Sequence, residues 1–369
     1  MKCFFIICIL LGICTVIKAQ DNANYSWVDN KVLQIPVAET YATAAIAGYV
    51  QAHFKTPEEK LRAVYKWITA NIYYSKDSMY FSNWGGDPEV KMAAILRKRK
   101  GVCDNYAALF TNIVLKCGIK AVVVSGYTKF GGATNRAGHS WCAVAVEKQW
   151  LLCDPTWDAG FNNAAKWFLI TPEEFIETHF PFDPLWQLLP FPLTHTQFRK
   201  GNMYLKNHDI AYNISDSVKT FLQLDTLQQL EAAALRMKQA GFENEQIKTW
   251  HDYYKMKIAI VYQEQDMQWY NIAVNALNNA RRLFNGYVQY RNNNYLPLRS
   301  IKDLNLLFDS IGTYIDSAHT TIKNIGKVVE NFQYNTDELI INLNKLWARM
   351  LEEKTYLSDL QQLNKRDKK

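Results

Sequence analysis

The first clear pattern of apolar positions lies in residues 56–74, TPEEKLRAVYKWITANIYY. Thr56 and Glu59 stand at the N-cap and N3 positions of a capping box, and Pro57 occupies the first helical position. Apolar residues then recur at helical spacing, at Leu61, Val64, Tyr65, Ile68 and Ile72. The pattern predicts an amphipathic helix with one face in a core.

Two more helical patterns follow. The segment 85–101, GGDPEVKMAAILRKRKG, has Asp87 as a candidate N-cap, and Gly101 lies just past its end, where it would let the chain turn. The next segment has a single apolar face, formed by Tyr106, Phe110, Ile113, Val114 and Cys117. Gly118 is expected to end this helix.

After the third helix the period of the apolar pattern changes. The runs IKAVVVSGY, HSWCAVAV and QWLLCDPTW are short and rich in β-branched and aromatic residues, and turn-forming segments separate them. These runs predict an antiparallel sheet. The fold class we expect for this half is therefore α+β.

The last two runs predict a β-hairpin. A two-residue turn at 147–148 would align the strands so that paired residue numbers sum to 295. His139 and Asp154 would then lie on one face as diagonal neighbours, while Cys142 and Cys153 would face each other on the opposite face. A slip of one residue would separate His139 from Asp154.

Beyond residue 200 the pattern of apolar and polar residues changes again. Apolar residues form helical stripes separated by Asn, Gln and Lys, for example Trp250, Tyr254, Ile258 and Val261, and later Leu339, Leu343, Leu346, Trp347 and Met350. These stripes predict an all-helical bundle, and their spacing explains the aromatic residues as core. We expect three parts: residues 1–19, an α+β domain over residues 20–199, and an α-helical bundle over residues 200–369.

Residues 1–19, MKCFFIICILLGICTVIKA, have the features of a secretory signal peptide: an early lysine, an apolar stretch and Ala19 as a small residue for cleavage. We therefore expect a secreted, periplasmic or cell-envelope protein. A membrane anchor is the alternative, but it needs a longer apolar span. A lipoprotein signal at Leu11–Cys14 is disfavoured because Ile13 is bulky for its position.

Charge disfavours a nucleic-acid partner. Removing residues 1–19 takes away Lys2 and Lys18 and leaves 40 basic against 35 acidic side chains, a net charge of +5. The basic runs are short, RKRK at 97–100 and NKRDKK at the C-terminus, and lysines in a last helical turn usually complement the helix dipole. No later stretch approaches 18 apolar residues, so no transmembrane span is expected in the mature chain.

Four cysteines remain after cleavage, at Cys103, Cys117, Cys142 and Cys153. They are too few for a disulfide scaffold in a chain of this length, although Cys142 and Cys153 could either pair or stay as small core residues. The sequence has no C-x-x-C or H-E-x-x-H motif. We therefore expect no metal site and no cofactor.

Cys103 begins the helix that ends near Cys117. Backbone N–H groups and the helix dipole favour a thiolate at that position, and a nucleophile also needs a base. His139 could be the base, and Asp154 could orient it. Singly, each residue has an ordinary structural explanation, Asp154 as a turn former before Pro155 for example. Together, on a helix followed by a hairpin, they indicate a site.

At these residues the sequence resembles the transglutaminase-like superfamily, whose fold is related to papain-type cysteine proteases. GVCDNYA, GHSWCAVAV and WLLCDPTWDAG resemble its three signature segments, most closely those of the kyphoscoliosis peptidase-like branch. The resemblance covers roughly residues 50–180 and implies a papain/transglutaminase-like core in which the cysteine-bearing helix packs on an antiparallel sheet. It implies Cys103 as nucleophile, His139 as general base and acid, and Asp154 as orienting carboxylate.

The resemblance implies a thiol enzyme that acts on amide bonds of a protein or peptide through an acyl-enzyme, as a peptidase or isopeptidase. The substrate could belong to the cell envelope, with the helical half as scaffold or docking surface. The alternatives are a transamidase that cross-links proteins and a binding module that keeps the fold without turnover.

Two features disfavour calcium-dependent cross-linking. Asp104 stands directly after the candidate nucleophile, where animal transglutaminases carry a tryptophan, and no acidic loop indicates a calcium site. For an oxyanion hole, one donor would be the backbone N–H of Cys103, and Trp84 in SNWGG is the candidate for the second.

Overall fold

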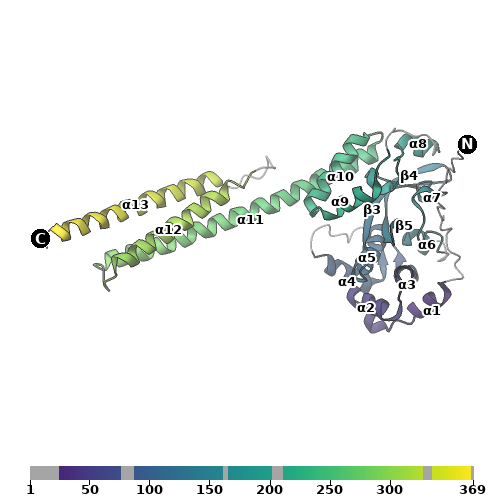
Figure 1. Ribbon diagram of the computed structural model, residues 1–369, viewed down its shortest axis with the longest axis horizontal. Coiled ribbons are helices and arrows are strands. Elements are labelled where there is room, and N and C mark those ends of the chain that lie inside the picture. Colours follow the sequence, from purple (N-terminus) through teal and green to yellow (C-terminus); the bar gives the residue numbers. More distant parts are fainter. Residues whose placement is uncertain (1–24, 76–86, 161–164, 202–210, 327–334, 367–369) are drawn as a thin grey trace, which may run out of the picture. The chain divides into compact units, whose positions relative to one another are not determined.

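The computed structural model describes residues 25–75, 87–160, 165–201, 211–326 and 335–366, and Figure 1 shows the order of the elements. The predicted signal peptide (residues 1–19) and Trp84 lie outside these residues. Within them, every helix is too short or too polar to cross a lipid bilayer.

The first part of the chain mixes helices and strands. Its helices are α1 (Ser26–Val32), α2 (Thr43–His53), α3 (Pro57–Asn71), α4 (Pro88–Lys98), α5 (Cys103–Lys116), α6 (Pro155–Gly160), α7 (Pro172–Phe175) and α8 (His195–Lys200). Its strands are β1 (Tyr73–Tyr74), β2 (Lys100–Gly101), β3 (Ala121–Phe130), β4 (Ala133–Val146), β5 (Gln149–Cys153) and β6 (His179–Pro181). The predicted α+β class is confirmed.

The amphipathic helix predicted from residue 56 onward is α3. Its capping box is present: the Glu59 N–H donates to Thr56 Oγ1 over 3.2 Å, and Glu59 Oε2 accepts from the Thr56 N–H over 3.1 Å. All five residues of the predicted apolar stripe are buried. Arg62 is also buried on this helix and donates two hydrogen bonds, of 2.7 and 2.6 Å, to Asp29 of α1, which holds the two helices together.

The chain turns after α4, but not where we expected. The residue with left-handed backbone angles is Arg99, with a φ of 53°, and Gly101 lies in the extended strand β2. The prediction that Gly101 makes the turn is therefore wrong. Glycine is needed there for a different reason, because a Cβ on Gly101 would lie 2.7 Å from Cβ of Asn105 in the first turn of α5.

The main sheet has four antiparallel strands in the order β5-β4-β3-β6. Strands β4 and β5 form the predicted hairpin, with Glu147 at a positive φ in its turn. Val146 pairs with Gln149 and Cys142 with Cys153, so the predicted register is confirmed. The edge strand β6 was not predicted, because three residues that pair with a distant strand leave no periodic pattern.

Both faces of this sheet are covered. Helix α5 packs on one face, where its buried residues share a core with Cys142, Val144 and Cys153. The alternate residues, including Trp141 and Ala143, enter a second core on the other face. The helix that begins at the candidate nucleophile is thus packed on an antiparallel sheet, as the resemblance implies.

The contacts divide the chain into two compact units. One contains Met1–Asp225 and Ala232–His251, and the other contains Thr226–Glu231 and Asp252–Lys369. The sequence pattern suggested a boundary at residue 200, and this boundary stays a prediction. The first unit also contains α9 (Ile214–Gln223) and parts of α10 (Thr226–Ala240) and α11 (Glu245–Asn292).

A partly buried ion pair holds α10 against the rest of the first unit. The guanidinium of Arg236 donates two hydrogen bonds of 2.7 Å to the carboxylate of Asp183, whose side chain is 6% exposed. Burial raises the pKa of Asp183, and Arg236 opposes that effect. Asn244, just before α11, also hydrogen-bonds the His195 ring of α8. Residues beyond 200 therefore help to build the unit that contains the candidate site.

The second unit contains the rest of α11 together with α12 (Ile301–Ile322) and α13 (Thr336–Arg366). All elements that the structure describes in this unit are helical. Its core consists of the predicted stripes, among them Leu304, Ile311, Ile315, Leu339, Leu343, Leu346 and Met350. The prediction of an all-helical C-terminal bundle is confirmed for these residues.

We expect Arg236→Leu to lower the free energy of unfolding by about 2 kcal/mol or more, because Asp183 would stay buried without its cation. Urea denaturation of the whole chain measures the loss. Arg97→Leu, at an exposed position in the last turn of α4, is the control and should change stability by less than about 0.5 kcal/mol. Equal effects of the two substitutions would contradict the structural role of the ion pair.

Candidate active site

Cys103 is the first residue of α5 and is partly exposed. The N-terminal turn is fixed by the Val102 N–H, which donates to Asn105 Oδ1 over 2.9 Å. Tyr74 of β1 lies near the thiol, since burial and the charge of Cys103 both raise the pKa of this tyrosine. The sulfur thus lies at the positive end of a helix dipole, beside a partly exposed aromatic ring.

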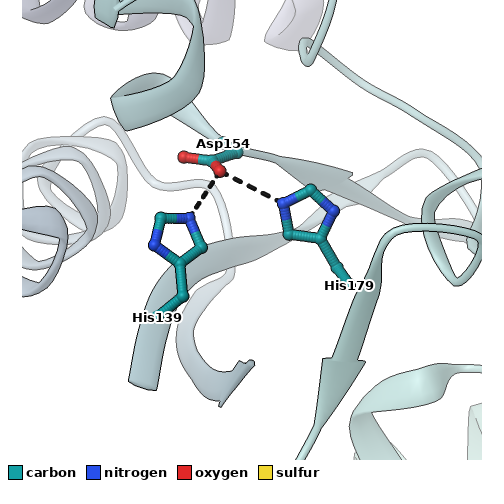
Figure 2. Close-up of side chains that lie close together, drawn as sticks. All are labelled: His139, Asp154 and His179. Atoms are coloured by element: carbon teal, nitrogen blue, oxygen red, sulfur yellow. Dashed lines mark hydrogen bonds and ion pairs between the residues drawn. The ribbon is translucent and has the colours of Figure 1, made fainter. Parts of the chain in front are cut away.

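His139 on β4 lies between Cys103 and Asp154. Its Nε2 is 2.7 Å from Asp154 Oδ2, a contact that Figure 2 marks with a dashed line, and its ring interacts electrostatically with the Cys103 side chain, which acts to raise the pKa of His139. Because Nε2 is bonded to Asp154, Nδ1 is the nitrogen left for the sulfur. The structure therefore brings together the three residues that the sequence pattern singled out. The hairpin register makes this possible, because it sets His139 diagonally across from Asp154.

The carboxylate of Asp154 is fully buried and accepts hydrogen bonds at both oxygens. Oδ1 accepts the backbone N–H groups of Thr156 and Trp157, over 2.9 and 3.2 Å, at the start of α6. Oδ2 accepts from His139 over 2.7 Å and from His179 over 3.2 Å. Four donors thus surround one buried carboxylate.

The charges of this group follow from burial and its partners. Burial acts to lower the pKa of His139, but Asp154 and Cys103 outweigh it and raise the pKa to about 10. Burial acts to raise the pKa of Asp154, but the two histidines hold it well below its usual range. At neutral pH Asp154 is therefore ionised and His139 carries a positive charge.

His179 is the residue that the sequence analysis missed. It lies on β6, is buried, and shares Asp154 Oδ2 with His139 (Figure 2). Burial lowers its pKa to about 4 although Asp154 acts to raise it, so His179 is neutral at neutral pH. No local pattern marks this histidine, since it reaches Asp154 only because β6 pairs with β3.

Aromatic side chains enclose the two imidazoles. Phe175 stacks on His179 with ring centroids 4.0 Å apart, and Trp157 lies 4.5 Å from His179 and 6.0 Å from His139. Trp141 contacts both imidazoles as well. The surroundings of Asp154 are therefore apolar apart from its hydrogen-bond donors, which makes each of these bonds electrostatically strong.

A glycine opposite His139 permits this packing. Gly126 on β3 pairs with His139 on β4, and a Cβ on Gly126 would lie 2.4 Å from Trp141 Cη2 and 2.1 Å from the Phe180 carbonyl oxygen. The absence of a side chain lets Trp141 and β6 approach β3 closely. Strand β6 carries His179, so this close approach helps to bring His179 to Asp154.

The loop after Asp154 is held by a second carboxylate. Asp158 is buried and accepts the N–H groups of Lys166 and Trp167 over 3.0 and 2.9 Å. The hydroxyl of Tyr65 on α3 lies 2.5 Å from Asp158 Oδ2 and 2.9 Å from the Asp154 carbonyl oxygen. These contacts tie the turn that contains Asp154 to α3.

Comparison with known proteins adds to this geometry. Residues 44–155 match the family model of the transglutaminase-like superfamily. The chain contains a transglutaminase-like domain. The resemblance drawn from the three sequence segments is thereby confirmed.

Relatives of the transglutaminase-like domain occur in several organisms. Kyphoscoliosis peptidase of Homo sapiens is 35% identical over 179 residues, which cover 42% of this chain and 25% of that protein. Hillarin of Drosophila melanogaster is 29% identical over 206 residues, which cover 48% of this chain and 24% of that protein. The chain thus spans about a quarter of the length of these curated relatives.

Among solved structures, the periplasmic domain of TgpA from Pseudomonas aeruginosa is similar to part of this chain. The identity is 19%, the match covers 38% of this chain and 50% of that one, and the TM-score is 0.28.

The other cysteines of the transglutaminase-like domain are buried and free. Cys142 Sγ lies 3.5 Å from the Ala107 carbonyl oxygen, and Cys153 Sγ accepts the Leu169 N–H over 3.3 Å. Burial raises the pKa of Cys117 to about 11 and that of Cys153 to about 12. Cys142 and Cys153 therefore do not form a disulfide in the structure, and each is a small residue of the core.

Three atoms of metal-ligand type also meet at this site. One atom each from His139, Asp154 and His179 lies within 4.8 Å of the others. Both imidazoles point a ring nitrogen at the same carboxylate oxygen, which fits two N–H donors on one acceptor rather than two lone pairs on a cation. The expectation of no metal stays a prediction.

The neutral state of His179 predicts a pH dependence of stability. Between pH 6.5 and pH 4 the unfolded chain binds a proton at this residue and the folded chain does not. The free energy of unfolding should therefore fall as the pH drops through this window, by up to about 3 kcal/mol from His179. Urea denaturation followed by tryptophan fluorescence measures it. His179→Gln should flatten the slope and His53→Gln, at an exposed position, should not; equal slopes would contradict the assignment.

Gly126→Ala should cost about 3 kcal/mol or more in stability, because the new Cβ overlaps backbone atoms of β6 that cannot move freely. The substitution should also slow alkylation of Cys103, because Gly126 pairs with His139 and a displaced His139 would no longer support the thiolate. Gly48→Ala is the matched control: nothing lies within 4 Å of a Cβ there, and in a helix it should be neutral or stabilise by about 0.5–1 kcal/mol. Retention of full stability and reactivity in Gly126→Ala would argue against the close-approach role.

Proposed function

We propose that the chain is a thiol-dependent enzyme that hydrolyses amide bonds of a protein or peptide, as a peptidase or isopeptidase. Cys103 is the proposed nucleophile, His139 the general base and acid, and Asp154 the orienting carboxylate. The observation that carries the proposal is that one imidazole, His139, both hydrogen-bonds the buried Asp154 carboxylate over 2.7 Å and interacts with the Cys103 side chain at the start of α5.

Several features support the chemistry of Cys103. A nucleophilic sulfur must react as the thiolate, and both an imidazolium and a helix N-terminus stabilise a negative charge there. His139 supplies the imidazolium and α5 supplies the helix N-terminus. Asp154 holds the imidazole in place and balances its charge, which is the role of the third member of such triads.

The proposed reaction has two steps. The Cys103 thiolate attacks the carbonyl carbon of the amide, and His139 gives its proton to the leaving amine as the C–N bond breaks. Water then attacks the thioester carbon and gives a proton to His139. The C–S bond breaks, a carboxylic acid leaves, and the proton on His139 restores the starting ion pair.

The negative oxygen formed in each step needs donors. The Cys103 backbone N–H is one candidate, since the first N–H groups of a helix have no acceptor within the helix. Trp84 remains the candidate for a second donor, as proposed from the sequence.

We favour water over an amine as the second substrate. Water is present at roughly 55 M, so an amine competes only where a pocket excludes water and holds the amine at the thioester. Asp104 could attract such an amine, but an acidic residue in the first turn of a helix has a sufficient explanation in the helix dipole.

We propose that the enzyme acts outside the cytoplasm, in the periplasm, at the cell envelope or as a secreted protein. Support comes from the charge, the apolar run and the small final residue of residues 1–19. One relative bears the name peptidase, which agrees with the proposed chemistry.

We expect iodoacetamide to alkylate Cys103 at neutral pH much faster than it alkylates an ordinary thiol. His139→Gln should slow the reaction at least about 10-fold. Peptide mapping by mass spectrometry identifies the modified residue. Cys117→Ala is the control and should leave the rate unchanged, because Cys117 is buried and its pKa is raised to about 11. A Cys103 that reacts no faster than free cysteine would favour a binding module without turnover.

A peptide library and, in parallel, a glutamine-containing protein with a fluorescent primary amine identify the reaction. Cleavage that Cys103→Ala abolishes would support the hydrolase. Amine incorporation that depends on Cys103, with no cleavage of any peptide, would replace the hydrolase with a transamidase.

A further inference from the structure

The carboxylate of Asp154 has one more donor than a triad needs. In addition to His139 and two backbone N–H groups, His179 Nε2 lies 3.2 Å from Oδ2. Both side chains are fully buried, with 0% exposure. A carboxylate can accept about four hydrogen bonds, and the two imidazoles and two N–H groups fill that number.

The protonation state of His179 can be assigned from its partners. A neutral imidazole has a single N–H, and a carboxylate can only accept, so the proton must be on Nε2. The other nitrogen, Nδ1, lies 2.7 Å from the Thr178 hydroxyl, which is itself 3.4 Å from the Phe175 carbonyl oxygen. The stacked Phe175 ring and the contacts with Trp157 fix the plane of the imidazole. His179 is thus a neutral donor with a fixed direction.

Such a donor has a specific effect on Asp154. The terminal torsion of an aspartate is broad, so a carboxylate bonded at only one oxygen can still rotate. The Thr156 and Trp157 N–H groups hold Oδ1, and His179 holds Oδ2 on the side away from His139. With both oxygens held, Oδ2 has one acceptor direction left, and His139 occupies it over 2.7 Å.

We propose that His179 is a positioning residue for the thiol chemistry: its Nε2–H fixes Asp154 Oδ2 and, through Asp154, fixes the imidazole of His139 toward Cys103. The inference rests on the proposed function of Cys103, His139 and Asp154. It goes beyond that function, because His179 touches neither the sulfur nor the bond to be broken.

A purely structural role makes different predictions. If His179 only fills an aromatic pocket, Phe should replace it well and Gln should replace it poorly. If the N–H donor matters, the order is reversed. Gln carries an amide nitrogen at about the distance of Nε2, whereas the amide of Asn is too short to reach Asp154.

The test measures kcat and KM of the whole chain on a peptide that it cleaves, for His179→Phe, His179→Gln and His179→Asn. We expect Phe and Asn to lower kcat about 10- to 100-fold with little change in KM, and Gln to keep most of the wild-type kcat. A Phe variant as active as wild type, or equal losses for Gln and Asn, would overturn the proposal. The Gln–Asn pair keeps the test decisive if the Phe variant does not fold.

A double-mutant cycle tests whether His179 acts through Asp154. In an Asp154→Ala background, His179→Phe should lower kcat by less than about 2-fold further. A second loss as large as that in the wild-type background would show that His179 acts independently of Asp154 and would overturn the proposal.

Alkylation of Cys103 by iodoacetamide separates this inference from the proposed function, since it needs no substrate. Without any Cys103-dependent turnover in the wild-type chain the hydrolase proposal fails, yet His179→Asn should still slow alkylation and His179→Gln should not. Equal alkylation rates in wild type, Gln and Asn variants would overturn the positioning role even where turnover is found.

Discussion

A buried charge at Asp154 is the constraint around which the part of this chain that contains the candidate site is organised. An ionised carboxylate with no exposure to solvent is stable only if donors replace its water. Those donors come from β4, from β6 and from the first turn of α6. Three elements must therefore meet at one point for the fold to be stable, and the same meeting sets His139 between Asp154 and Cys103.

The packing around the carboxylate serves the same purpose. Aromatic rings exclude water from the two imidazoles, which strengthens the hydrogen bonds but would make any unmet polar group costly. Two histidines share one oxygen but differ in charge, because burial and the charge of His139 lower the pKa of His179, whereas Asp154 and Cys103 raise that of His139. His139 faces the Cys103 sulfur and is protonated, whereas His179 faces a hydroxyl and an aromatic cage and is neutral.

Local features made part of this site predictable. The hairpin register follows from a two-residue turn, and it correctly set His139 beside Asp154 and Cys142 opposite Cys153. The position of Cys103 at the start of α5 was predicted from helical periodicity together with a turn at Gly101, and it is confirmed although the turn itself lies at Arg99. His179 could not be found in this way, because a three-residue edge strand has no period and its partner strand is distant in the sequence.

Other features were beyond the sequence for related reasons. The turn after α4 uses Arg99 in a left-handed conformation, and the role of Gly101 depends on how close Asn105 comes. The ion pair between Arg236 and Asp183 joins α10, which lies in the half of the sequence with helical patterns, to the rest of the first unit. The apolar pattern changes near residue 200, and a sequence pattern can locate such a change. It cannot locate ion pairs between residues that are far apart in the sequence.

The four thiols of the described residues lie in two kinds of environment. Cys103 is partly exposed, and Cys117, Cys142 and Cys153 are buried and held as neutral thiols by the core. Of these four thiols, the folded chain therefore presents one, Cys103, to a bulky reagent, while the unfolded chain presents all four. The stoichiometry of thiol modification thus counts folded molecules directly, without any need to know the substrate.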